Sequence, residues 1–97
     1  MVDRIRVALC DDHTVVRSGL RRILSEEDDI DVVGEARTGE EAIALASAMR
    51  PDVFVMDLGL PGVSGIEATQ KVREMSPTTR VRRRLRGWNT DVVRARP

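Results

Sequence analysis

The segment Val53-Phe54-Val55-Met56-Asp57 decides the fold, because an unbroken apolar run leads directly into a carboxylate. The residues that follow, Leu58-Gly59-Leu60-Pro61-Gly62, carry the glycine and proline of a turn. A short apolar run bounded by turn residues is typical of a buried strand in a parallel sheet. Asp57 is therefore predicted at the carboxyl end of a strand, at the edge of an α/β sheet where ligands bind.

A second apolar run, Ile5-Arg6-Val7-Ala8-Leu9-Cys10, ends in the acid pair Asp11-Asp12. If the two strands are neighbours, Asp11, Asp12 and Asp57 come together at one edge of the sheet. Close carboxylates repel one another, so such a site must take up protons or bind a cation. Oxygen ligands of this kind suit Mg²⁺ or Mn²⁺. A bound cation would also screen the charge of an incoming phosphoryl group and let a carboxylate oxygen attack phosphorus.

A purely structural alternative stays open for these acids. Aspartate is a preferred residue at the start of a helix, so Asp11 and Asp12 would serve as helix caps while Asp57 stabilises a loop. The neighbouring His13 is interpreted as a partly exposed residue of the first helical turn, because magnesium sites lined by acids rarely use imidazole. Cys10 is interpreted as a small buried residue.

The rest of the chain alternates helical and strand patterns, which predicts a parallel α/β sheet with right-handed crossovers. No glycine-rich loop suited to a nucleotide occurs in it. Apolar spacing, turn residues and capping boxes predict a helix from Thr14 to Ser25, a strand over 30–36, a helix after Thr38 that ends at Arg50-Pro51, a helix from Gly65 to Met75, and the approach to a fourth strand over 78–81. The predicted buried faces of the three helices are Val16, Leu20, Ile23 and Leu24; Ala42, Leu45, Ala46 and Met49; and Ala68, Val72 and Met75.

The composition is that of one small globular domain. The chain has 97 residues, of which 41% are hydrophobic and 33% charged, so it can bury a modest, mainly aliphatic core. Its single cysteine excludes an internal disulfide, and no apolar stretch reaches the length of a membrane span or resembles a signal peptide. A cytoplasmic protein is therefore expected.

Three parts of the sequence occur in the order found in a known signalling family. They are VALCDDH followed by VRSGL (7–13 and 16–20), DVFVMDLGLPG (52–62) and SGIEA (64–68). Together they resemble the receiver domain of response regulators, most closely the group with a LuxR-type helix-turn-helix output domain (the NarL/FixJ group). The resemblance covers residues from about 5 to 81. It is specific as a set, because acid pair, acceptor aspartate and Pro-Gly turn all appear in order.

This resemblance implies a flavodoxin-like (CheY-like) parallel sheet of strand order 2-1-3-4-5, incomplete here after the start of the fourth strand. It implies a phosphorelay signalling module, not an enzyme, in which Asp57 accepts phosphate from a histidine kinase. Asp12 and Asp57 would hold Mg²⁺ directly, Asp11 mostly through water, and the backbone carbonyl of Gly59 would be a further ligand. Transcription would be regulated through an output domain, and this chain has no DNA-binding element of its own.

The family pattern breaks after Val81. Residues 82–97 hold six arginines against one aspartate, a net charge of +5, while the rest of the chain carries −5. The segment 82–86 cannot form a central strand, because arginines would be buried on both of its faces. A receiver needs a strand that ends in Ser or Thr and a later lysine, yet Thr90 is not at a plausible strand end and no lysine follows Lys71.

Two units are therefore expected, a partial receiver domain over 1–81 and an Arg-rich tail over 82–97. The tail is interpreted as a basic arm for nucleic acid, a disordered extension, or the product of a frameshifted or truncated gene, which the abrupt change of composition favours. Such a sheet would leave the third strand as an open edge and the first strand uncovered beside the first helix. Low stability or self-association, such as a homodimer, is then expected.

Two functional alternatives are kept beside the phosphorelay hypothesis. One is a Mg²⁺-dependent phosphatase-like enzyme with an aspartate nucleophile, against which Gly59 stands where such an enzyme needs its general acid. The other is an interaction remnant that takes no phosphate.

Overall fold

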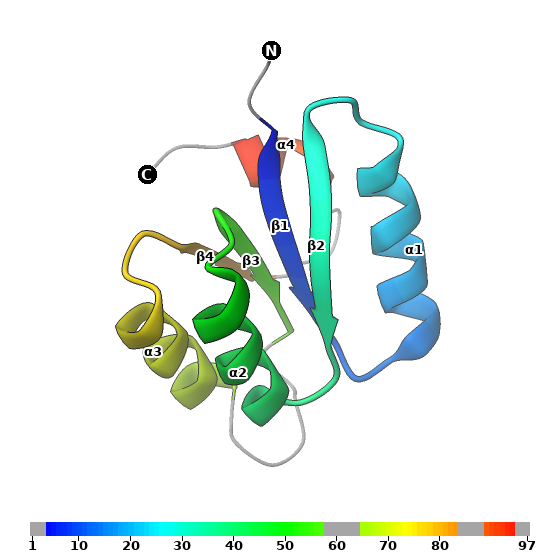
Figure 1. Ribbon diagram of the computed structural model, residues 1–97. Coiled ribbons are helices and arrows are strands. Elements are labelled where there is room, and N and C mark those ends of the chain that lie inside the picture. The colour runs from blue at the N-terminus through cyan, green and yellow to red at the C-terminus, as the bar shows by residue number, and fades with distance from the viewer. Residues whose placement is uncertain (1–3, 58–64, 84–88, 95–97) are drawn as a thin grey trace.

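The computed structural model describes residues 4–57, 65–83 and 89–94 (Figure 1). Strands and helices alternate along the chain, as the hydrophobic pattern predicts. The elements are β1 (Ile5–Cys10), α1 (Thr14–Ser25), β2 (Ile30–Ala36), α2 (Gly39–Met49), β3 (Val53–Met56), α3 (Gly65–Met75), β4 (Arg80–Arg83) and α4 (Asp91–Arg94). The predicted bounds of the first three helices and the second strand are confirmed.

The four strands form one parallel sheet in the order β2-β1-β3-β4. This is the predicted order 2-1-3-4, without the fifth strand among the described residues. β1 lies between β2 and β3, and its last residue, Cys10, is level with Met56 of β3 and Ala36 of β2. The chain therefore leaves β1 and β3 at the same edge of the sheet.

Both faces of the sheet are covered, which explains the unbroken apolar runs of its central strands. Successive side chains of a strand point to opposite faces. Figure 1 shows α2 and α3 side by side on one face, where Phe54 and Met56 pack with Ala42, Ala46, Ala68 and Val72. On the other face, Leu20 and Leu24 of α1 pack on the alternate residues Val7, Leu9, Val53 and Val55.

Two of the predicted core positions are wrong. Ile23 is 46% exposed and Met75 is 49% exposed, whereas their partners Leu24 and Val72 are fully buried. Each residue turns about 100° from its neighbour around a helix. Ile23 therefore lies at the margin of the apolar stripe of α1, and Met75 is the last residue of α3.

Helix α2 begins and ends as its sequence predicts. The hydroxyl of Thr38 accepts a hydrogen bond of 3.1 Å from the Glu41 N–H, and the Glu41 carboxylate accepts one of 2.9 Å from the Arg37 N–H. The Glu41 side chain thus accepts from Arg37, the residue before the cap. In a capping box it would accept from the backbone N–H of the cap residue itself, Thr38. The helix ends at Arg50, which adopts the left-handed conformation with φ of 45° before Pro51.

Strand β4 corrects the expectation that β3 is the open edge. Arg80–Arg83 pair in parallel with β3, and Val81 lies opposite Phe54 with only 9% of its surface exposed. The domain boundary expected at residue 81 therefore falls inside a strand. An edge strand tolerates arginines because one of its sides faces water, which a central strand does not allow. Residues 84–88, which the tail prediction also included, lie outside the described residues.

The described end of the tail, residues 89–94, lies against the rest of the domain. Val93 of α4 is fully buried and packs with the side chains of β1 that face α1. Figure 1 shows α4 beside β1. Arg94 donates to both carboxylate oxygens of Asp29, at 2.7 and 3.0 Å. These hydrogen bonds hold the pKa of Asp29 below its usual value and raise that of Arg94. The face of β1 that was expected to be bare is therefore partly covered.

Val93→Ala tests whether this docking supports the fold. The substitution removes apolar atoms from a closed core, so we expect the free energy of unfolding to fall by about 2 kcal/mol. The matched control is Val15→Ala, the same truncation in a helix at a side chain that is 85% exposed, which should change the value by less than about 0.5 kcal/mol. Urea unfolding followed by circular dichroism measures both. Equal effects of the two substitutions would show that α4 does not contribute to stability.

Candidate functional site

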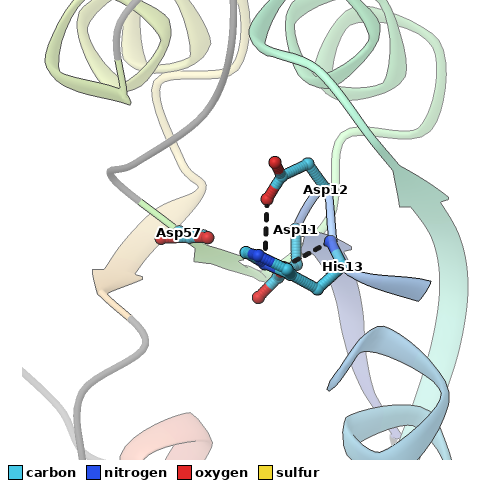
Figure 2. Close-up of side chains that lie close together, drawn as sticks. All are labelled: Asp11, Asp12, His13 and Asp57. Atoms are coloured by element: carbon cyan, nitrogen blue, oxygen red, sulfur yellow. Dashed lines mark hydrogen bonds and ion pairs between the residues drawn. The ribbon is translucent and has the colours of Figure 1, made fainter. Parts of the chain in front are cut away.

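Asp11, Asp12 and Asp57 meet at the carboxyl ends of β1 and β3, as the sequence predicts (Figure 2). With His13 they form a group in which one ligand atom from each residue lies within 4.8 Å of all the others. Asp11 is 1% exposed, and Asp12 and Asp57 are partly exposed. Gly59, the fourth predicted ligand, lies outside the described residues.

Backbone pairing of the sheet continues past the strand ends and fixes the acids. The Asp57 N–H donates to the Cys10 carbonyl at 2.9 Å, and the Asp11 N–H donates to the Ala36 carbonyl at 3.1 Å. The two main chains are thus held side by side where the acidic side chains begin. The convergence follows from the parallel register, so it does not depend on the loop after β3.

His13 stands between the carboxylates of the acid pair. The ring Nδ1 of His13 lies 3.0 Å from an oxygen of Asp11 and 3.0 Å from an oxygen of Asp12. The backbone N–H of His13 donates to the same Asp11 oxygen at 2.9 Å. His13 is also the residue that precedes α1, and its side chain is 64% exposed. The predicted partly exposed histidine is confirmed, and the acids are not themselves the N-cap residue. The Asp11 oxygen accepts from the backbone N–H of the residue before the helix, and no side chain caps the first turn, so the structural alternative of helix caps does not account for the acid pair.

The Asp12 carboxylate fits a cation. Its Oδ1 is buried and has no hydrogen-bond partner among the described parts of the chain. This oxygen lies 3.0 Å from His13 Nδ1, but that nitrogen carries at most one hydrogen, so it cannot donate to Asp11 and Asp12 at once. Buried carboxylate oxygens without a donor are costly, and a cation bridging two or three of them removes that cost. An oxygen-rich donor set with room for water suits Mg²⁺.

Cys10, directly before the acids, is buried, as predicted, and its thiol has low reactivity. Its Sγ lies 3.5 Å from the Thr38 carbonyl, to which it donates. Burial, followed by the nearby charges of Asp11 and Asp57, raises the pKa of the thiol to about 12. The thiolate is the reactive form, so very little of it exists at neutral pH.

This leads to a prediction for thiol reactivity. At pH 8 we expect native protein to react with a disulfide reagent such as DTNB at least about 100-fold more slowly than urea-unfolded protein, in which Cys10 has an ordinary pKa. Release of the coloured thiol measures both rates. Comparable rates in the two states would contradict the burial of Cys10 beneath the acid pair.

Arg17 lies outside the buried face predicted for the first helix, yet the structure encloses its side chain. Only 13% of this side chain is exposed. Its Nη1 donates to the Asp11 carbonyl at 2.7 Å, and its Nε donates to Glu35 of β2 at 3.1 Å. Arg17 precedes the buried Leu24 by seven residues and so points almost in the same direction around α1. This seven-residue spacing from Leu24 is the feature of the sequence that could have predicted the burial of Arg17.

Comparison with known proteins identifies the family. The family model for the response regulator receiver domain matches residues 7–82, most of the chain. The chain belongs to this family. The receiver resemblance seen in the sequence is therefore confirmed.

Individual relatives and structures agree with this assignment. Response regulator GacA of Pseudomonas viridiflava is 44% identical over 77 residues, which are 79% of this chain and 36% of the relative. The receiver domain of a putative NarL from Mycobacterium tuberculosis superposes with a TM-score of 0.76 at 39% identity, covering 81% of this chain and 64% of that one. The response regulator domain of Thermotoga maritima CheB gives 0.79 at 33% identity, covering 93% and 69%. The predicted CheY-like fold and NarL-type relationship are confirmed.

The chain spans about a third of the length of the curated relatives it matches. No helix in the described ranges is long and apolar enough to cross a membrane. Thr90, which the sequence analysis rejected as the hydroxyl at the end of the fourth strand, donates to Glu27 at 3.0 Å. Thr79 lies at the opposite end of β4 from the acids and donates to the Pro51 carbonyl. The hydroxyl groups of Thr79 and Thr90 are therefore not placed beside Asp57.

Proposed function

We propose that this receiver domain accepts a phosphoryl group on Asp57 from a histidine kinase, with Mg²⁺ bound at the acid cluster. The observation that supports the proposal is the convergence of three carboxylates from two strands within 4.8 Å of one another. Asp12 and Asp57 would hold the ion directly, Asp11 mostly through water, and the Gly59 carbonyl would be a further ligand. His13, which lies between Asp11 and Asp12, would give way to the ion.

The proposed step is a displacement at phosphorus. A carboxylate oxygen of Asp57 forms the new bond to phosphorus, while the bond between phosphorus and the donor breaks. The donor leaves with the electron pair of that bond and takes up a proton. A Mg²⁺ ion held by these acids would offset the repulsion between their carboxylates and the phosphoryl oxygens. The protein positions the nucleophile through the Asp57 N–H to Cys10 carbonyl hydrogen bond.

The proposed role is that of a signalling module and not an enzyme that turns over a substrate. It would act in the cytoplasm, with a histidine kinase as phosphate donor, and in a longer protein an output domain would regulate transcription. Self-association through the outer edge of β4 is also proposed, because this strand pairs only with β3 among the described strands.

The decisive experiment is intact mass spectrometry after incubation with acetyl phosphate, with and without Mg²⁺. We expect one added phosphoryl group on the wild type in Mg²⁺, none after chelation, and none on Asp57→Asn. The matched control is Asp31→Asn, the same change at an exposed position of β2, which should be phosphorylated like the wild type.

Each other outcome has a distinct meaning. A folded, soluble wild type that takes no phosphate would contradict the proposal and support an interaction remnant. Continuous release of phosphate from p-nitrophenyl phosphate, lost in Asp57→Asn, would instead support the phosphatase-like alternative. Phosphate that appears equally on Asp57→Asn would mean that another residue is the acceptor.

A further inference from the structure

We propose that Arg17 is a positioning residue for the acid pair, holding the peptide between Asp11 and Asp12 while Glu35 holds Arg17. This inference rests on the proposed function, because it concerns the same site. It assigns the site a supporting residue on α1 that makes no contact with the phosphoryl group or the ion in its proposed role.

The evidence is a chain of hydrogen bonds from β2 to the acids. The Arg17 guanidinium donates to the Asp11 carbonyl at 2.7 Å and to a Glu35 carboxylate oxygen at 3.1 Å. The second oxygen of Glu35 accepts from Arg21, one helical turn further along α1. The main chain of Glu35 is paired in the sheet opposite Leu9 of β1, the strand that leads into the acid pair. A planar guanidinium donates to two such acceptors in fixed geometry.

The Asp11 carbonyl is a sensitive point for the site. It belongs to the planar peptide that joins Asp11 to Asp12, so fixing its oxygen also restricts where the Asp12 N and Cα lie. The Asp11 N–H is already bound to Ala36 at 3.1 Å, and its carboxylate accepts from the His13 N–H. The hydrogen bond from Arg17 adds a constraint on the Asp11 carbonyl, which is the part of Asp11 that joins it to Asp12.

Arg17 also carries a charge, and the two effects predict opposite results. If its main influence on the site were Coulombic, a cation near the acids would weaken Mg²⁺ binding, and removing Arg17 would tighten it. If it positions the acids, removing it frees the peptide and weakens Mg²⁺ binding. Partners that orient metal ligands typically contribute tenfold or more in affinity. The sign of the change therefore distinguishes the two.

The experiment titrates MgCl₂ into ¹⁵N-labelled full chain and follows the amide signals of Asp12 and Asp57. We expect Arg17→Met to weaken Mg²⁺ binding on the order of tenfold. Arg17→Lys keeps the charge but loses the planar guanidinium that donates to two acceptors. Its Mg²⁺ affinity should lie between that of Arg17→Met and that of the wild type. Arg22→Met is the matched control, because Arg22 lies on the same helix but is 85% exposed and pairs with Glu26, and it should stay within about twofold. Circular dichroism confirms that each variant is folded.

Mg²⁺ binding by Arg17→Met that is as tight as wild type, or tighter, would overturn the inference. If Arg17→Met does not fold, Glu35→Gln replaces it, and unchanged affinity in that variant overturns the inference in the same way. Phosphorylation by acetyl phosphate is measured in parallel. A wild type that binds Mg²⁺ but takes no phosphate defeats the proposed function, while the ratio of Mg²⁺ affinities still decides the role of Arg17. A wild type that binds no Mg²⁺ overturns both.

Discussion

The parallel register of β1 with β3 is the constraint on which the site depends. It sets Cys10 level with Met56, so the residues that follow them leave the sheet together. Because the backbone hydrogen bond from Asp57 to Cys10 extends this pairing, acids that are 45 residues or more apart in the chain become neighbours. The repulsion among them is opposed by the packing of two apolar strands, which are buried on both faces. The fold thus assembles a charge cluster that unconnected side chains would avoid.

Much of this was predictable, because the decisive signals are local. The apolar run 53–56 ends in an acid, and the helices carry their own spacing and caps, such as Thr38 before α2. The acids were predicted to converge from the rule that parallel strands end at one edge. His13 was placed correctly at the start of α1, although its position between the carboxylates of Asp11 and Asp12 depends on side-chain geometry that no sequence spacing specifies.

What the sequence did not show depends on contacts between distant segments. The Arg94 to Asp29 ion pair joins residues 65 apart, and α4 is a single turn of four residues, too short for a periodic signal. A charged run such as that around Asp29 is interpreted as a solvated turn until its partner is known. Likewise, Arg17 is a polar residue on an amphipathic helix, and only the carbonyl and carboxylate that meet it explain its burial. Electrostatic partners are thus harder to predict than apolar faces.

The central claim is that Asp11, Asp12 and Asp57 form a divalent-cation site in the folded chain. The most direct test is the free energy of unfolding with and without Mg²⁺ at constant ionic strength, for the wild type and Asp12→Asn. A ligand that binds only the folded state stabilises it, by about 1.4 kcal/mol when its free concentration is about ten times Kd. We predict that Mg²⁺ stabilises the wild type and has a much smaller effect on Asp12→Asn. An equal response of the two proteins, or none in the wild type, would contradict the account.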